Sequence, residues 1–187
     1  MRIHIIIIIF LFTLLSCKKT YTPKPYGYYR INLPKHEYKN FNDTIFPYTF
    51  DYPVYTNIEI INKDSMWLNI NYKKNKAKIY LTYKKINNSL DKLLDESQNF
   101  VNKHLIKADA INENLFINDT NKTYGTLYRI KGNTASSINF FLTDSTKNFI
   151  RGALYFNCHP NKDSLEPVIN FIQTDIKQFM KTFKWKN

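Results

Sequence analysis

The 187-residue chain is poor in glycine, cysteine and acidic residues, and each shortage excludes a class of protein. Four glycines argue against a glycine-rich phosphate loop, a collagen-like repeat or a long flexible linker. Two cysteines cannot form the disulfide framework of a small secreted scaffold. The 15 acidic residues are outnumbered by 27 lysines and arginines, which gives a net charge of +12. A charge of this sign usually indicates nucleic acid or an anionic membrane as a partner.

Aromatic residues, in contrast, are abundant, with 14 tyrosines and 14 phenylalanines. Hydrophobic residues make up 43% of the chain, which excludes disorder along its whole length. The length fits one domain, and a chain of this size buries roughly 70% of its unfolded surface. The sequence therefore predicts a single folded domain with a substantial core.

The amino terminus resembles the signal peptide of a bacterial lipoprotein. An apolar stretch runs from Ile5 to Leu15, too short for a membrane-spanning helix of about 20 residues. Leu14-Leu15-Ser16-Cys17 then resembles a lipobox, in which the cysteine becomes the diacylated amino terminus after cleavage. The alternative is an ordinary signal peptide or anchor with a cysteine there by chance. We predict that residues 1–16 are the signal peptide and that Cys17 is lipidated.

Lipidation of Cys17 changes the interpretation of the charge and of the second cysteine. More than one acyl chain gives stable anchoring, so membrane lipid becomes a predicted partner and nucleic acid does not. Loss of Arg2 with the signal peptide leaves a net charge of +11. Cys158 then has no partner within the chain, and we expect it to be a small buried apolar residue.

Residues 17–45 are predicted to be the lipidated cysteine followed by a tether. Pro-rich chain favours extended polyproline-II geometry, which suits a spacer. A spacer does not need an aromatic cluster, however, and we expect residues 28–33 to dock on the domain. The cluster supplies candidate partner-binding residues, namely Tyr26, Tyr28, Tyr29 and Arg30.

Residues 46–187 are predicted to form the globular domain, and its first half mixes strands with one helix. Apolar and polar residues alternate over 46–53, between prolines, which is typical of an edge strand. Residues 66–72 and 77–85 alternate likewise and are predicted to form a hairpin. A helix follows, with Asn88 or Ser89 as its cap, and a short strand is expected within 106–118.

The second half predicts a three-stranded meander over 124–130, 137–143 and 149–157, then a helix capped by Ser164. Pro167 is expected in the first turn of that helix, where its missing N–H is harmless. The fold class predicted is α+β: a mostly antiparallel sheet packed with two amphipathic helices. This order of elements resembles PsbP/Mog1-like domains.

No catalytic or metal-binding pattern is present in the sequence. His36, His104 and His159 lie far apart and lack the spacing of metal ligands. No G-x-S-x-G, P-loop or H-E-x-x-H motif occurs, and most acidic residues fall in turns and helix caps. We therefore predict no enzymatic activity, no metal and no cofactor. A rival hypothesis, a ligand-binding module or small enzyme, requires Arg129, Arg151, His159 and carboxylates to share a cavity.

Lysines gather in the hairpin at 73–85 and along the last helix. They are either a solvated surface or a contact with anionic headgroups or an acidic partner.

Several motifs together resemble the gliding motility lipoprotein GldD family of Bacteroidetes. The carboxyl-terminal half carries KGNTASS (131–137), FFLTDSTKNFIRGALYF (140–156) and PNKDSLEPVINFI (160–172). The amino-terminal half carries YTPKP (21–25), FPYTFDYP (46–53) and WLNI (67–70). The resemblance covers nearly the whole mature chain. Tyr26 departs from it, because the family has an arginine there, which puts any contact made by that arginine in doubt.

The resemblance implies a membrane-anchored envelope protein required for gliding motility and for type 9 protein secretion. The implied role is a non-catalytic assembly or stabilising component whose partners are other gliding and secretion envelope proteins. The alternatives are a small periplasmic ligand-binding or cell-wall-acting module, or a lipoprotein of general envelope integrity. Lys18-Lys19 lacks the acidic run that favours surface export in this phylum, so the domain is expected to face the periplasm, on either membrane.

Strand edges and turns supply the remaining candidates for partner binding. An exposed edge can pair with a strand of a partner. The candidates are Phe46 and Tyr48 in the strand at 46–53, and Asn133 in the turn at 132–137.

Overall fold

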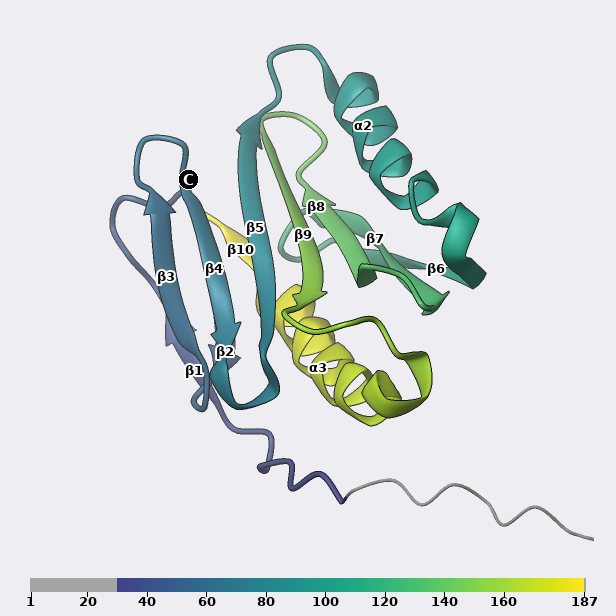
Figure 1. Cartoon of the computed structure of the whole chain (residues 1–187). Coiled ribbons are helices and arrows are strands. Elements are labelled where there is room, and N and C mark those ends of the chain that lie inside the picture. The colour runs from purple at the N-terminus through teal and green to yellow at the C-terminus, as the bar shows by residue number, and fades with distance from the viewer. Residues whose placement is uncertain (1–29, 187) are drawn as a thin grey trace, which may run out of the picture. The chain divides into compact units, whose positions relative to one another are not determined.

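A seven-stranded antiparallel sheet is the centre of the fold (Figure 1). The structure, a computed structural model, describes residues 30–186, and a compact unit begins at Ile31. The strands run in the order β3-β4-β5-β9-β8-β7-β6 across the sheet. Their bounds are β3 Asn57–Asn62, β4 Trp67–Tyr72, β5 Ala77–Lys85, β6 Ala108–Asn118, β7 Thr123–Gly132, β8 Ser136–Thr143 and β9 Asn148–Phe156.

A smaller sheet brings the beginning and the end of the domain together. Its order is β1-β2-β10, with β1 at Tyr38–Phe41, β2 at Tyr48–Pro53 and β10 at Lys184–Trp185. Both outer strands pair antiparallel with β2. The segment that precedes residue 46 therefore contributes a strand to the domain.

The two helices lie on opposite faces of the large sheet. Alternate residues of a strand point to opposite faces, so β8 separates the two packing clusters. Phe140 and Leu142 of β8 pack in one cluster with α3 (Lys162–Thr182), whereas Phe141 packs in the other with α2 (Leu90–Asn102). Short 3-10 turns lie at Lys73–Asn75 and at Leu105–Lys107.

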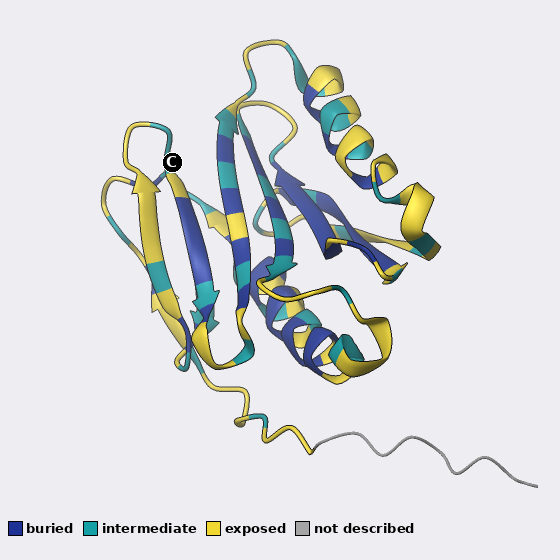
Figure 2. Cartoon of the chain, in the orientation of Figure 1, coloured by how far each residue is buried: buried dark blue, intermediate teal, exposed yellow. Residues whose placement is uncertain are grey.

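The larger core fills the space between α3, the small sheet and the large sheet. In Figure 2 the side of α3 that faces the sheets is buried, and β3 and much of α2 are exposed. Aromatic rings dominate this core, with Phe50 and Phe179 4.6 Å apart between centroids. Phe46, Tyr48 and Phe183 are completely buried beside them. The large aromatic content of the sequence thus goes mainly into one core.

The predicted fold class is confirmed: the domain is α+β, with antiparallel strands and two helices. The hairpin β4–β5 and the meander β7–β8–β9 occur where the sequence patterns place them. The strand expected within 106–118 is long, with eleven residues. Strands β1, β3 and β10 carry no clear alternating pattern and were not predicted.

The predicted start of the last helix was wrong by about one turn. Asn161, not Ser164, is the capping residue, because its side-chain oxygen accepts a hydrogen bond from the Ser164 N–H at 3.1 Å. Pro167 consequently lies in the second turn and not in the first. Helix α2 does begin after Ser89, but the Ser89 side chain makes no capping hydrogen bond.

Candidate functional site

Asp175 is a carboxylic acid on the buried face of α3, a face that is otherwise apolar. Residues three and four positions apart share a helix face, and Asp175 lies between Ile172 and Phe179 in that row. The residue is only 1% exposed. Burial of a charge is costly unless hydrogen-bond donors surround it, so the donors around Asp175 define the site.

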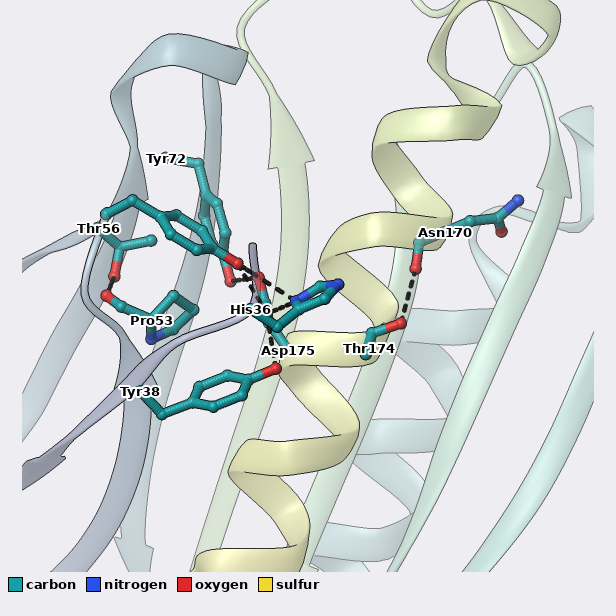
Figure 3. Close-up of polar contacts among 9 residues, drawn as sticks. His36, Tyr38, Pro53, Thr56, Tyr72, Asn170, Thr174 and Asp175 are labelled. Carbon is teal, nitrogen blue, oxygen red and sulfur yellow. Dashed lines mark hydrogen bonds and ion pairs between the residues drawn. The ribbon is translucent and has the colours of Figure 1, made fainter. Parts of the chain in front are cut away.

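Four side chains surround the Asp175 carboxylate (Figure 3). The ring Nδ1 of His36 lies 2.7 Å from Oδ1, and the Tyr38 hydroxyl donates to the same oxygen at 3.0 Å. The Tyr55 hydroxyl lies 2.9 Å from Oδ1 and 2.8 Å from Oδ2. Tyr72 donates to Oδ2 at 3.2 Å. We call these five residues the Asp175 clamp.

The clamp joins segments that are remote in the sequence. His36 and Tyr38 belong to the chain that enters β1, and Tyr55 lies in the turn between β2 and β3. Tyr72 is the last residue of β4, in the large sheet. One carboxylate on α3 therefore holds the entry to the domain, the small sheet and the large sheet together.

Aromatic packing supports the hydrogen bonds of the clamp. The His36 ring stacks on Phe171, with centroids 4.4 Å apart and planes inclined by 27°. The ring of Tyr55 lies 5.6 Å from the same Phe171. The His36 side chain is 33% exposed, so the clamp reaches the surface at this residue although its carboxylate does not.

Burial and the charge of Asp175 keep the three clamp tyrosines protonated, so that their hydroxyls can donate hydrogen bonds. Burial, followed by the hydrogen bond and the negative charge of Asp175, raises the pKa of Tyr55 far above its ordinary value. Burial and the Asp175 charge raise the pKa of Tyr38 and Tyr72 in the same direction. All three hydroxyls thus stay protonated at neutral pH. Both oxygens of Asp175 accept hydrogen bonds and the residue is almost completely buried, so its role is structural: it holds the surrounding segments together.

A basic groove of about 890 Å³ is lined by residues of β3, β4, β5 and β9 and of the turn after β4, and the clamp residue Tyr72 contributes to its lining. Three lysines enter its lining, Lys73, Lys76 and Lys78, together with the rings of Tyr80 and Tyr155. The two rings meet edge to face, with centroids 5.6 Å apart. We call this the Lys-Tyr groove.

Glu59 is the acidic residue of the Lys-Tyr groove. It accepts hydrogen bonds from Asn71 at 3.1 Å, Lys78 at 3.1 Å and Asn69 at 3.3 Å. These bonds, that of Asn71 first, lower its pKa to about 2. Glu59 is therefore ionised at neutral pH and offsets only part of the lysine charge.

A second groove, of about 640 Å³, runs between β6 and α3. Arg129 of β7 lies beneath it, only 5% exposed, and donates to Glu166 at 2.8 Å. Asparagine and glutamine side chains provide most of the remaining lining. We call it the β6–α3 groove, and its residues are Ile111, Asn112, Glu113, Asn114, Arg129, Lys131, Glu166, Asn170 and Gln173.

The residues predicted to bind partners differ in their exposure to solvent in the structure. The side chains of Phe46 and Tyr48 are fully buried in the aromatic core, so they are not available on the surface. Asn133 is exposed at its turn, and its side-chain oxygen accepts from the Lys162 N–H at 2.9 Å. Arg30 is exposed. Cys17, Tyr26, Tyr28 and Tyr29 lie outside the described residues.

Two other expectations concern the ends of the domain. Leu33 packs against the larger core, in agreement with docking of the end of the tether, whereas Ile31 is exposed. Cys158 was expected to be buried, but it is exposed, because it lies in the loop between β9 and α3.

The three residues that a catalytic or ligand-binding hypothesis requires do not converge. Arg129 faces α3, whereas Arg151 lies on the other face of the sheet, 4.0 Å from the ring of Phe100 in α2. His159 lines neither of the two grooves. Within residues 30–186, no group of three or more histidines, cysteines and acidic residues is placed to hold a metal ion.

The sequence patterns did not identify His36 and Asp175 as a pair. A charged residue in the apolar stripe of the last helix was the available signal, because such a residue needs buried partners. The partners themselves are remote in the chain, with a separation of 139 positions between His36 and Asp175. No local spacing connects residues so far apart.

Comparisons with known proteins identify the family of the chain. No helix in the described part of the chain is long and apolar enough to cross a membrane. No curated protein matches the chain. The solution structure of cyanobacterial PsbP from Synechocystis is similar, with a TM-score of 0.49 and 15% identity over 87% of this chain and 99% of that one. The family model of the gliding motility lipoprotein GldD matches residues 18–185, and the chain belongs to that family.

Proposed function

We propose that this protein is a lipid-anchored, non-catalytic component of the cell envelope that assembles or stabilises the machinery of gliding motility and type 9 protein secretion. The family match supports association with the envelope and a role in gliding motility. The role in secretion is our own extension of that match. The absence of catalysis is our inference from the described residues, in which no set of reactive side chains converges on either groove.

The Asp175 clamp is the observation that favours a mechanical role. It fastens the segment that follows the tether to the centre of the domain by hydrogen bonds from His36 and Tyr38. When the first strand is held to the core, a pull on the lipid anchor acts on the whole domain. If the first strand were frayed, the pull would unfold that strand first. The anchor in this proposal is acylated Cys17, and the domain faces the periplasm.

Candidate contacts with partners lie in the tether and near its end, at Tyr26, Tyr28, Tyr29 and Arg30. Replacement of this stretch by glycine and serine, followed by crosslinking in whole envelope, tests them. The proposal expects loss of particular crosslinked proteins, with the abundance of the lipoprotein unchanged. Unchanged partners and unchanged secretion would contradict a role for these residues.

Complementation of a deletion strain is the direct test of the proposed function. The strains carry the wild-type chain, Cys17→Ala or Asp175→Asn, and motility and secretion are scored separately. We expect Cys17→Ala to lose both activities, because the domain is no longer held at the membrane. Lys177→Gln, an exposed change on the same helix as Asp175, is the matched control. Full motility and secretion in the Cys17→Ala strain would refute the proposal.

The Lys-Tyr groove favours a second candidate function, the binding of an anionic group such as a lipid headgroup. Three lysines and two aromatic rings around one groove are suited to a negatively charged ligand with an apolar part. This candidate is compatible with the first, because a domain anchored by lipid lies next to such headgroups.

A further inference from the structure

We propose that the free edge of β6 binds an extended segment of a partner protein by strand addition, and that this segment alternates apolar with polar residues and carries a basic residue opposite Glu113. The inference deepens the proposed function, because it assumes that the domain works through protein partners. It assigns the contact to a surface of the large sheet that the sequence patterns did not indicate.

Strand β6 is the last strand of the large sheet (Figure 1). It pairs with β7 from Ala108↔Gly132 to Asn118↔Thr123, and within residues 30–186 no strand pairs with its other edge. Half of the backbone N–H and C=O groups of an edge strand point away from its neighbour. An edge of eleven residues therefore offers a long row of unused hydrogen-bonding groups.

Strand β6 has little of the usual protection of an edge strand: its charged side chains are only Asp109 and Glu113, and its one irregularity lies at its start. Natural edges are shielded by lysine, proline, bulges or short length. Residues 108–118 contain no lysine, arginine or proline, although the chain holds 27 lysines and arginines. The one irregularity of β6 lies at Ala108/Ala110, which leaves the rest in regular register. The opposite edge, β3, is shorter, has a bulge at Ile60/Asn62 and ends beside Lys63.

One face of β6 presents apolar side chains to solvent. Leu115 is 81% exposed and Ile117 is 68% exposed, and as alternate residues they lie on the same face. Their cross-strand partners are Thr126 and Tyr124 in β7. An added strand would place its own side chains beside these two, so its residues opposite Leu115 and Ile117 are apolar, whereas its residue opposite Glu113, on the same face, is the basic one.

The other face of β6 borders the β6–α3 groove and is polar along the groove, and Phe116 beyond it packs against the larger core. Asn112 and Asn114 lie on this face, opposite Arg129 and Leu127. Across the groove, Asn170 and Gln173 of α3 complete a set of amides that can donate and accept hydrogen bonds. Side chains of the added strand on this face are therefore polar. The two faces together specify an alternating sequence.

Charge indicates the nature of the partner more closely. Glu113 is exposed, lies opposite Tyr128 and makes no ion pair with another described residue. Burial, with the charge of Glu113, raises the pKa of Tyr128, which agrees with a carboxylate close to that hydroxyl. A second copy of β6 contains no basic residue to offer Glu113, so a symmetric β6–β6 pair leaves this carboxylate without a partner. We assign the complementary segment to another protein, with lysine or arginine at this position.

Photo-crosslinking along the strand in living cells tests the inference. A photoreactive amino acid is placed in turn at Glu113, Leu115 and Ile117 in the full lipidated chain, with Ile61 on the opposite edge as the matched control. Strand addition predicts a ladder: each step of two residues along β6 moves the crosslink by two residues along one segment of the partner. The crosslinked segment, read by mass spectrometry, should alternate apolar and polar residues and contain a basic residue.

A variant with a protected edge provides the second arm. Leu115→Lys with Ile117→Lys removes the apolar face of the edge, and both side chains are exposed, so the unfolding midpoint should not change. We expect the crosslink yield from residue 113 to fall about tenfold and motility to fall with it. Ile61→Lys should leave both at the wild-type level.

The outcomes separate this inference from the proposed function. Crosslinks that are absent, scattered along several proteins, or made to β6 of a second copy overturn strand addition by a partner. Normal motility and crosslinks in the Leu115→Lys, Ile117→Lys strain also overturn it, while loss of motility in the Cys17→Ala strain keeps the proposed function. If Cys17→Ala retains full motility and secretion, the proposed function fails, whatever the ladder shows.

Discussion

At the scale of single residues, Asp175 carries the clearest structural consequence. A buried carboxylate stabilises a fold only while its donors remain in place, and removal of one side of such an arrangement leaves groups without partners. The clamp satisfies Asp175 with His36 and three tyrosines. Aspartate is usually a surface residue, but here the stability of the fold depends on it.

Substitution of Asp175 measures that dependence. We expect Asp175→Ala to lower the free energy of unfolding by about 3–5 kcal/mol, because three tyrosine hydroxyls lose their acceptor. Asp175→Asn keeps the volume and should cost less, about 1–3 kcal/mol. Denaturant unfolding of these variants beside Lys177→Gln, which should match wild type, is the measurement. Equal stability of Asp175→Ala and the control would show that the clamp contributes nothing.

The clamp tyrosines give a testable dependence on alkaline pH. Their pKa values are raised in the folded state, by burial first and by Asp175 next, so the folded protein holds these protons more tightly than the unfolded chain. Stability is complete below the ordinary tyrosine pKa of about 10 and falls as pH rises above it. Chemical unfolding between about pH 8 and about pH 11.5 should show the decline, and Tyr72→Phe should make it shallower. A stability that rises with pH in this window would contradict the assignment.

At the scale of secondary-structure elements, β8 and β9 fit together because one residue has no side chain. Gly152 of β9 pairs with Phe140 of β8, and a Cβ atom at Gly152 would lie 2.1 Å from the Phe140 ring. Phe140 also packs on Phe179 of α3, with centroids 5.5 Å apart. The position of that ring between sheet and helix therefore requires glycine on the neighbouring strand.

Gly152→Ala should lower the free energy of unfolding by roughly 1–3 kcal/mol, because the ring of Phe140 has to move into a filled core. The double variant Gly152→Ala with Phe140→Leu should recover part of that loss, since the smaller side chain leaves room. Thermal or denaturant unfolding of both single variants and the pair gives the coupling energy. Additive effects in the double variant would mean that the two residues do not compete for space.

Sequence patterns predicted the elements that alternate clearly and missed those that do not. The β4–β5 hairpin and the meander contain strands with a buried face, which local periodicity reports. Strand β3 is exposed along most of its length, and β10 has two residues, so neither shows a buried face. The pairing of β10 with β2 joins the two ends of the domain, which local periodicity does not encode.

The candidate site shows the same limit more sharply. Asp175 was visible as a charge in an apolar stripe, but its partners are brought to it only by the folded arrangement of both sheets on α3. Phe46 and Tyr48 failed as surface candidates for a related reason. Their segment was expected at the edge of a sheet, but in the structure β2 is the middle strand of a second sheet and faces the core.

At the scale of the whole molecule, the net charge of +12 is unevenly distributed over the domain. The lysines of the hairpin line a groove with two tyrosine rings, whereas Lys177 and Lys181 of α3 stand on its exposed side. Strand β6, in contrast, holds only acidic charge. The domain thus presents a basic groove and an acidic sheet edge as two separate surfaces.

Binding to anionic vesicles distinguishes a specific lysine surface from diffuse charge. Near an anionic membrane each lysine contributes about 1 kcal/mol, so Lys73, Lys76 and Lys78 together are worth roughly a hundredfold in partitioning at low salt. The non-lipidated chain from residue 18 should bind vesicles rich in phosphatidylglycerol, and the triple change of these lysines to glutamine should weaken binding by that factor. Added salt should remove the difference, because the Debye length falls to about 3 Å at 1 M.

The control for this experiment removes the same charge from a different surface. It changes Lys177, Lys181 and Lys184 to glutamine, two exposed lysines in the carboxyl-terminal part of α3 and one just after it. Both triple variants then carry the same total charge, so a purely diffuse attraction would weaken equally in the two. A larger loss for the groove variant would assign membrane contact to the Lys-Tyr groove. Equal losses would show that the groove is not the membrane-binding surface and that only the total charge matters.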